Sequence, residues 1–149
     1  MLSLTLYCNK TNYSMNNVRF ATALHILTLL EVSKGEWLPS AYIAGSININ
    51  PVLFRKEISN LRKQGLLASR EGKGGGSTLA KPASAIWLSD IYEAVRQSPL
   101  LGRSNKPNPA CPVGKQINQH LDTLYAGAEE ALVRKLNKVS LADFAHQFS

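Results

Sequence analysis

The sequence has little cysteine and no long apolar run, and both shortages narrow the classes of protein that it can encode. Only Cys8 and Cys111 occur among 149 residues, too few for a disulfide framework and without the paired spacing of a zinc site. The longest mostly apolar run, residues 20–32, is interrupted by polar side chains and is shorter than the ~18–20 residues that span a membrane. The first residues do not match a secretory signal. We therefore expect a cytoplasmic protein without a membrane segment.

Acidic residues are also scarce relative to basic ones. Seventeen Lys and Arg against 10 Asp and Glu give a net charge of +7. Much of this excess is concentrated between residues 50 and 81, which carry seven cations and two acids. A concentrated positive charge favours a polyanionic partner such as nucleic acid. A solvated helix face would show the same composition, so charge alone does not decide between the two.

Residues 17–33 predict a buried helix, because apolar side chains occupy nearly every face of the segment VRFATALHILTLLEV. Ser14 or Asn16 is expected to cap its start, and Lys34 with Gly35 to end it. We interpret His25 in its middle as a core or interface histidine with a satisfied ring.

The next segment has the helix-start and turn residues that are typical of a helix-turn-helix. Pro39 suits the first turn of a short second helix that ends just before Asn48. Asn48 stands where this motif needs a tight turn, and asparagine tolerates a positive φ. Asn50 and Pro51 then supply a cap and a first residue for a third helix, which is expected to run to Gln64.

The third helix has two contrasting faces. Phe54, Ile58 and Leu61 share one stripe and predict the core side. The other side carries a polar and basic set that fits a major groove, namely Val52, Arg55, Lys56, Ser59 and Lys63. An ordinary amphipathic helix would show the same stripe, and the preceding helix and turn favour the helix-turn-helix.

A glycine-rich hairpin follows. Residues 67–70 and 77–80 are expected to pair as short strands around a tip at residues 71–76. Glycine lets a backbone approach a phosphate closely. We interpret the hairpin as a wing that contacts the minor groove or its phosphates through Arg70, Lys73, Gly74 and Gly75. A nucleotide-binding loop is the alternative, but Lys73 precedes the glycines and no helix follows them directly.

The C-terminal third predicts a fourth helix at residues 86–97 and then the longest helix of the chain. The long helix has an apolar face of about six and a half turns, or ~36 Å, which includes Ile117, Leu121, Leu124, Tyr125 and Leu132. A small head cannot cover that length, so we expect two copies to pair along it. A last short helix, capped by Ser140, is expected to fold back.

These patterns predict a mainly α fold with a small β-hairpin wing, that is, a winged helix-turn-helix head and a long C-terminal dimerisation helix. The expected divisions are an N-terminal arm at residues 1–14, a DNA-binding domain at 15–97, a loop at 98–111, and the dimerisation helix with the C-terminal helix at 112–149. The arm is expected to be frayed, or not native if Met15 is the true start.

Three segments resemble the Rrf2 family of bacterial winged-helix transcription regulators. They are SREGKGGGSTLAKPAS, INPVLFRKEISNLRKQGLL and NPACPVGKQINQHLDTLY, and the resemblance covers about residues 15–148. It implies a homodimer with the third helix in the major groove and the wing in the minor groove. It also implies base-facing positions for Asn50 and Arg55, and a wing role for Arg70.

Several members of this family bind an iron–sulfur cluster through three cysteines that precede the long helix. Only Cys111 lies in that region of this sequence, and such clusters need about four ligands. The chain therefore looks similar to a clusterless, single-cysteine branch, and we expect no cofactor and no metal site.

Cys111 has two interpretations. It is expected to cap the long helix ahead of Pro112, where the helix dipole and Lys115 favour a reactive thiolate. It would then be a redox or electrophile sensor. Alternatively, it is a small, partly buried residue without a sensory task.

The sequence therefore predicts a homodimeric, sequence-specific DNA-binding transcription regulator, a repressor, and not an enzyme. Its partners would be double-stranded DNA and an unknown small-molecule or redox effector. Two alternatives are a thiol-dependent enzyme that uses Cys111, although no Cys/His/acid set supports it, and a winged helix that contacts only proteins.

Overall fold

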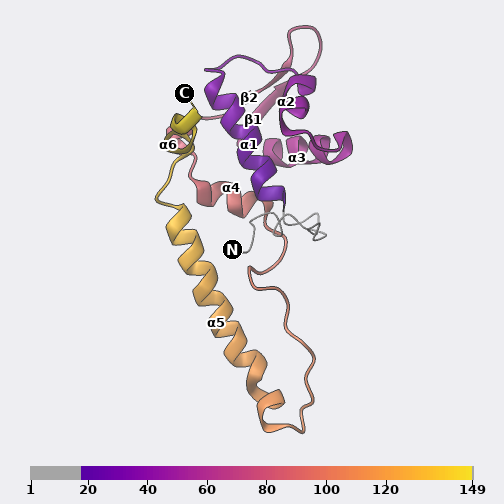
Figure 1. Ribbon diagram of the computed structural model, residues 1–149, viewed down its shortest axis with the longest axis vertical. Coiled ribbons are helices and arrows are strands. Elements are labelled where there is room, and N and C mark those ends of the chain that lie inside the picture. The colour runs from indigo at the N-terminus through magenta and orange to yellow at the C-terminus, as the bar shows by residue number, and fades with distance from the viewer. Residues whose placement is uncertain (1–17, 149) are drawn as a thin grey trace, which may run out of the picture.

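The molecule consists of a head and a long helix that projects from it (Figure 1). The computed structural model describes residues 18–148. The head contains α1 (Arg19–Val32), α2 (Ser40–Ile47), α3 (Pro51–Lys63), the strands β1 (Leu67–Arg70) and β2 (Gly76–Leu79), the 3₁₀ turn η3 (Ala83–Ala85) and α4 (Leu88–Val95). The chain continues into α5 (Pro112–Leu136), α6 (Leu141–Ala145) and η4 (His146–Phe148). The expected mainly α fold with one antiparallel hairpin is confirmed.

Helix α1 forms the centre of the head. Ala23, Ile26 and Leu27 are fully buried, because neighbouring elements cover the helix on several sides. His25 is not a core residue, however: it lies exposed, with Nε2 3.1 Å from Oγ of Ser46 on α2. The capping residues expected at positions 14 and 16 lie outside the described residues.

The turn between α2 and α3 has the expected geometry. Asn48 ends α2 with φ at 58°, in the left-handed region that asparagine tolerates. Asn50 caps α3, because its Oδ1 accepts a hydrogen bond of 2.8 Å from the backbone N–H of Val52, and Pro51 is the first helical residue. These local signals fix where the third helix starts and which face points outward.

A buried ion pair fixes α3 against α1. Glu57 is 5% exposed, and its carboxylate accepts hydrogen bonds of 2.9 and 3.2 Å from the guanidinium of Arg19. Asn60 donates to the same carboxylate and to the carbonyl oxygen of Ala94. Since these contacts connect α1, α3 and α4, the outward face of α3 is held on a rigid support.

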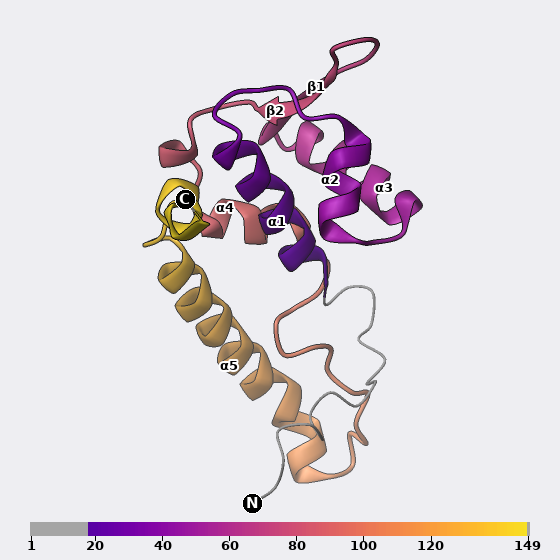
Figure 2. The same cartoon turned by 45° about the horizontal axis from the view of Figure 1, so that its top comes forward.

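The hairpin is joined to the loop between α1 and α2. Ser69 lies opposite Ser77 in the β1–β2 register, and Leu38 forms a further antiparallel bridge with Ser77. Gly76, at φ 142°, passes so close to Leu38 that a Cβ atom would collide with its carbonyl group. The base of the wing is therefore fixed, while its tip extends beyond the rest of the head (Figure 2).

Helix α4 starts two residues later than the sequence predicts. Trp87 is extended and bridges to Ser140, which keeps residues 86 and 87 out of the helix. The side chain of Asp90 accepts a hydrogen bond from the backbone N–H of Trp87 and so caps the helix.

The last helix, α6, packs against the head. Leu141, fully buried, lies in the head core, and its N–H donates to the carbonyl oxygen of Ile86. The last helix thus folds back as expected and completes the core.

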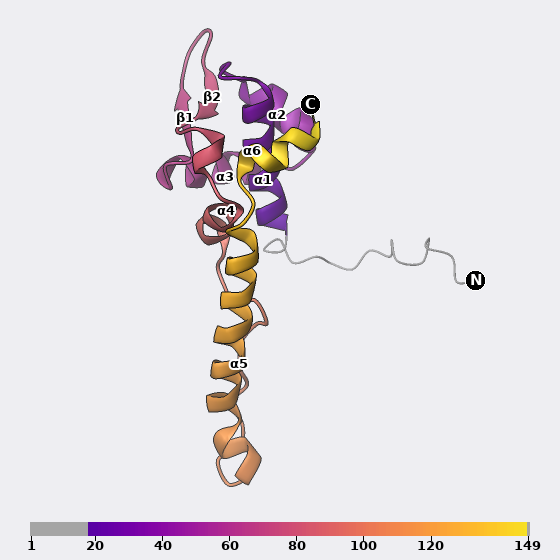
Figure 3. The ribbon, with the colours of Figure 1, turned by 90° about the vertical axis from the view of Figure 1, so that its left-hand side faces the viewer.

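Helix α5 leaves the head and has no buried residue along its 25 residues, which correspond to ~37 Å. Figure 3 shows how far it projects. One acidic side chain, Glu129, holds it to the head: it accepts from the hydroxyl of Tyr92 at 2.8 Å, pairs with Arg96 and accepts from the N–H of Leu100 at 3.2 Å. None of the described helices is both long enough and apolar enough to cross a membrane.

Candidate nucleic-acid interface

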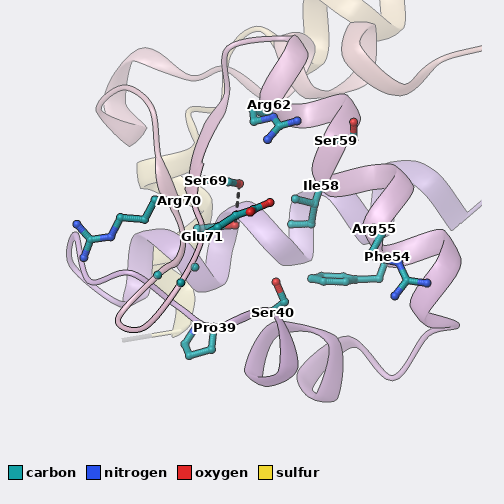
Figure 4. Close-up of a pocket in the computed structure, with 14 residues that line it drawn as sticks. Pro39, Ser40, Phe54, Arg55, Ile58, Ser59, Arg62, Ser69, Arg70 and Glu71 are labelled. Atoms are coloured by element: carbon teal, nitrogen blue, oxygen red, sulfur yellow. Dashed lines mark hydrogen bonds between the residues drawn. The ribbon is translucent and has the colours of Figure 1, made fainter.

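A groove of about 580 Å³ separates α3 from the wing (Figure 4). Arg55, Ser59 and Arg62 line it from α3, and Arg70 and Glu71 line it from the wing. Its floor includes the apolar side chains of Phe54 and Ile58, which also pack into the core. The sequence predicts the recognition helix and the wing as separate elements, and the structure places them on the two sides of one groove.

The outward surface of α3 carries cations that no acid on the same helix neutralises. Arg55, Lys56 and Lys63 are exposed and form no ion pair within residues 18–148. Glu57, the only acid of α3, is buried and bonded to Arg19. A rigid helix face with uncompensated cations attracts a polyanion and matches the depth of a major groove.

The first turn of α3 presents two of the predicted residues in different ways. Val52 is 61% exposed, so its methyl groups are open to a partner. Asn50 is exposed as well, but its Oδ1 is occupied by the capping hydrogen bond to Val52. Its side-chain amide nitrogen remains as a hydrogen-bond donor. Ser59, half-buried, lies one to two turns farther along the same face.

The wing arginine is held by an aromatic residue that the sequence did not single out. The guanidinium carbon of Arg70 lies 4.3 Å from the ring centroid of Trp37, and Nη2 donates a 2.9 Å hydrogen bond to the carbonyl oxygen of Gly74. Figure 4 shows Arg70 directed away from α3. Lys73 and Gly74 are exposed at the tip, and Gly75 follows them. The wing thus presents its cations along its outer edge.

Glu71 brings one negative charge into this basic groove. It is exposed, and Figure 4 shows its side chain between the wing and α3. The sequence identified Glu71 only as part of the hairpin tip, because its orientation depends on the path of the strands. A carboxylate here opposes the surrounding cations wherever a phosphate approaches.

The expected dimerisation residues lie on α5 as open side chains. Ile117 is 38% exposed and Leu124 is 60% exposed, with Val113 on the same face at 66%. Leu121, Tyr125 and Leu132 are half-buried. The described chain thus covers this face only in part, and an exposed apolar stripe of this kind is typical of an interface.

Comparison with known proteins agrees with this architecture. Residues 16–147 match the family Rrf2, described as an iron-dependent transcriptional regulator. YwnA of Bacillus subtilis (strain 168), provisionally named as an HTH-type transcriptional regulator, is 42% identical over 130 residues, which cover 87% of this chain and 96% of YwnA. The chain belongs to the Rrf2 family. As a member, it is a DNA-binding transcription regulator. The family and these relatives are regulators and not enzymes, which contradicts the alternative of a thiol-dependent enzyme.

Solved structures carry the same fold. A crystal structure of a protein provisionally named as DNA-binding has a TM-score of 0.67 and 36% identity, covering 85% of this chain and 97% of that one. CymR, the global cysteine regulator of B. subtilis, has a TM-score of 0.64 at 23% identity, covering 87% and 94%. At that identity, CymR supports the Rrf2 fold and nothing finer.

The iron dependence in the Rrf2 description raises the question of whether this chain can hold an iron–sulfur cluster. Cys111, exposed at the cap of α5, is the only cysteine among residues 18–148, and that part of the chain contains no group of three or more His, Cys, Asp or Glu placed to hold a metal. One thiol does not fit a cluster that needs about four ligands. Cys8 lies outside the described residues, so the expectation of no cofactor stays a prediction.

Proposed function

We propose that this Rrf2-family chain is a homodimeric repressor that binds specific operator sequences in the cytoplasm. The observation that carries the proposal is the groove between α3 and the wing, with unpaired cations on its α3 wall and Arg70 and Lys73 along the outer edge of the wing. Helix α3 would enter the major groove, where Asn50, Val52, Arg55, Lys56 and Ser59 face the bases and phosphates. The wing would reach the adjacent minor groove or its phosphates with Arg70 and Lys73.

Two copies would pair through α5. Its apolar residues Ile117 and Leu124 are 38% and 60% exposed, and a symmetric dimer presents two recognition helices to two half-sites about one helical turn apart. The operator is therefore expected to be an inverted repeat. Repression follows if such a dimer occupies a promoter.

Cys111 is proposed as the sensing residue. Its thiol is exposed at the start of α5, and its side chain makes no capping hydrogen bond, so an oxidant or electrophile has access to it. Modification there would change the helix on which the dimer depends. Peroxide or disulfide stress should release DNA from the wild type but not from Cys111→Ser, and equal release from both proteins would reject the sensor.

DNA binding is tested by selecting duplexes from a random library and measuring their affinity. The selected operator should bind at least about 10³-fold more tightly than a scrambled duplex. Arg55→Ala and Arg70→Ala should each weaken binding with the dimer intact and flatten the salt dependence by about one unit of slope per lost phosphate contact. Lys138→Ala removes an equal charge far from the groove and serves as the control. Failure to select any duplex would instead favour a winged helix that contacts only proteins.

A further inference from the structure

Val52 is an exposed apolar side chain on a basic helix. It occupies the second position of α3, is 61% exposed, and is not among the residues that pack in the core. Single exposed valines are common on protein surfaces. This one, however, lies in the first turn of the helix that would face DNA, which is the part of a recognition helix that reaches the base edges.

Hydrogen-bond donors dominate around Val52. The amide oxygen of Asn50 is partly committed, because its Oδ1 already accepts a 2.8 Å hydrogen bond from the N–H of Val52 and keeps only one further lone pair. Arg55 and Lys56 can only donate. The one carboxylate of α3, Glu57, is buried against Arg19. Beside several donors, the first turn therefore offers only the second lone pair of Asn50 Oδ1 to the amino groups of adenine or cytosine.

A face made mostly of donors and methyl groups matches some bases better than others. In the major groove, guanine offers two acceptors, and thymine offers one acceptor and a 5-methyl group, whereas cytosine presents an amino group and no methyl. The three-residue separation of Val52 and Arg55 corresponds to ~4.5 Å along the helix axis, somewhat more than the ~3.4 Å rise of one base-pair step. Both side chains can thus contact neighbouring base pairs.

We propose that Val52 reads the 5-methyl group of a thymine in each operator half-site. The inference rests on the proposed function, since it assigns a base preference to the same face of α3. It makes a methyl contact, in addition to charge, a determinant of which operator is bound.

The test removes that methyl group from the DNA alone. Operator duplexes selected from the random library are synthesised with deoxyuridine in place of thymidine at one position at a time. We expect the wild type to bind about fourfold more weakly at one thymine per half-site, which corresponds to about 0.8 kcal/mol for one buried methyl group. Binding that is unaffected by the exchange at every position would overturn the inference.

Comparing two variants tests whether Val52 is the residue that contacts the methyl group. Val52→Ala should remove most of the difference between the thymidine and deoxyuridine duplexes, and its thermal unfolding should match the wild type because residue 52 is exposed. Lys56→Ala, the matched control one turn away, should bind both duplexes more weakly and keep the fourfold ratio. If Val52→Ala keeps that ratio, another residue contacts the methyl and the inference is wrong. If no duplex is selected at all, the proposed function fails first.

Discussion

At the scale of single residues, the charge of Glu71 has the clearest consequence for DNA affinity. Its carboxylate lies in the groove between α3 and the wing, where a phosphate would meet it. We expect Glu71→Gln to tighten operator binding about two- to fivefold at low salt, since one like-charge repulsion in a solvated site is worth on the order of 1 kcal/mol. Glu36→Gln makes the same change in net charge outside the groove and should have little effect. The difference between the two variants should shrink as salt is raised.

Trp37 is the second residue-scale determinant, because it holds the wing arginine. Trp37→Ala frees the guanidinium of Arg70 from its stacked position, and we expect operator affinity to fall about two- to fivefold, the range for an exposed cation–π contact. Trp37→Phe should retain most of the affinity. In an Arg70→Ala background, Trp37→Ala should have no further effect. Additive losses in that double mutant would show that Trp37 acts by another route.

Local chemistry explains which of these residues the sequence could predict. Asn48, Asn50 and Ser140 were predicted as a turn and two caps, because each acts on backbone groups within a few positions. Trp37 and Arg70 are far apart in the chain, and Arg19 and Glu57 are separated by 38 positions. Such pairs depend on how whole elements pack, so periodicity and spacing could not reveal them.

At the scale of elements, the junction between α4 and α5 should depend on pH. Burial alone would raise the pKa of Glu129, but hydrogen bonds from Tyr92, from the N–H of Leu100 and from Arg96 outweigh it and lower that pKa from its usual 4.5. The ionised carboxylate therefore stabilises the folded state above pH 4.5, and this contribution is lost as the pH falls through the lowered pKa.

Chemical denaturation at several pH values tests the junction. The wild type should be more stable than Glu129→Gln at pH 7, and the gap between them should close as the pH falls below 4.5 and through the lowered pKa of Glu129. Glu130→Gln is the control, because Glu130 pairs only with exposed Arg134 on the same helix and such pairs contribute little. A gap that is independent of pH would reject the role of the Glu129 charge.

The start of α4 shows why element boundaries were only partly predictable. Residues 86 and 88 are both apolar and buried, which fits a helix as well as an extended strand. The bridge between Trp87 and Ser140 decides between them, and its partner arrives from the far side of α5. The starts of α3 and α5, by contrast, follow from Asn50 and Cys111 with the proline after each.

At the scale of the whole molecule, DNA affinity should depend on the proposed pairing of α5 with a second copy. Leu124→Glu places a charge at the centre of the exposed apolar face, and we expect it to shift the protein from dimer to monomer in analytical ultracentrifugation. Operator affinity should fall by at least about tenfold, because the two recognition helices are no longer linked. Gln119→Glu, on another side of α5, should stay dimeric. A monomeric wild type would contradict the proposal directly.

The return of α6 to the head has a consequence for biosynthesis. Leu141 is fully buried in the same core as α1, and its N–H donates a hydrogen bond to the carbonyl oxygen of Ile86 before α4. On the ribosome, residues 18–97 therefore emerge without the side chain that fills part of their interior. The nascent head can reach its final packing only after residues 140–145 have left the exit tunnel, so competence to bind an operator is delayed until that segment has emerged as well.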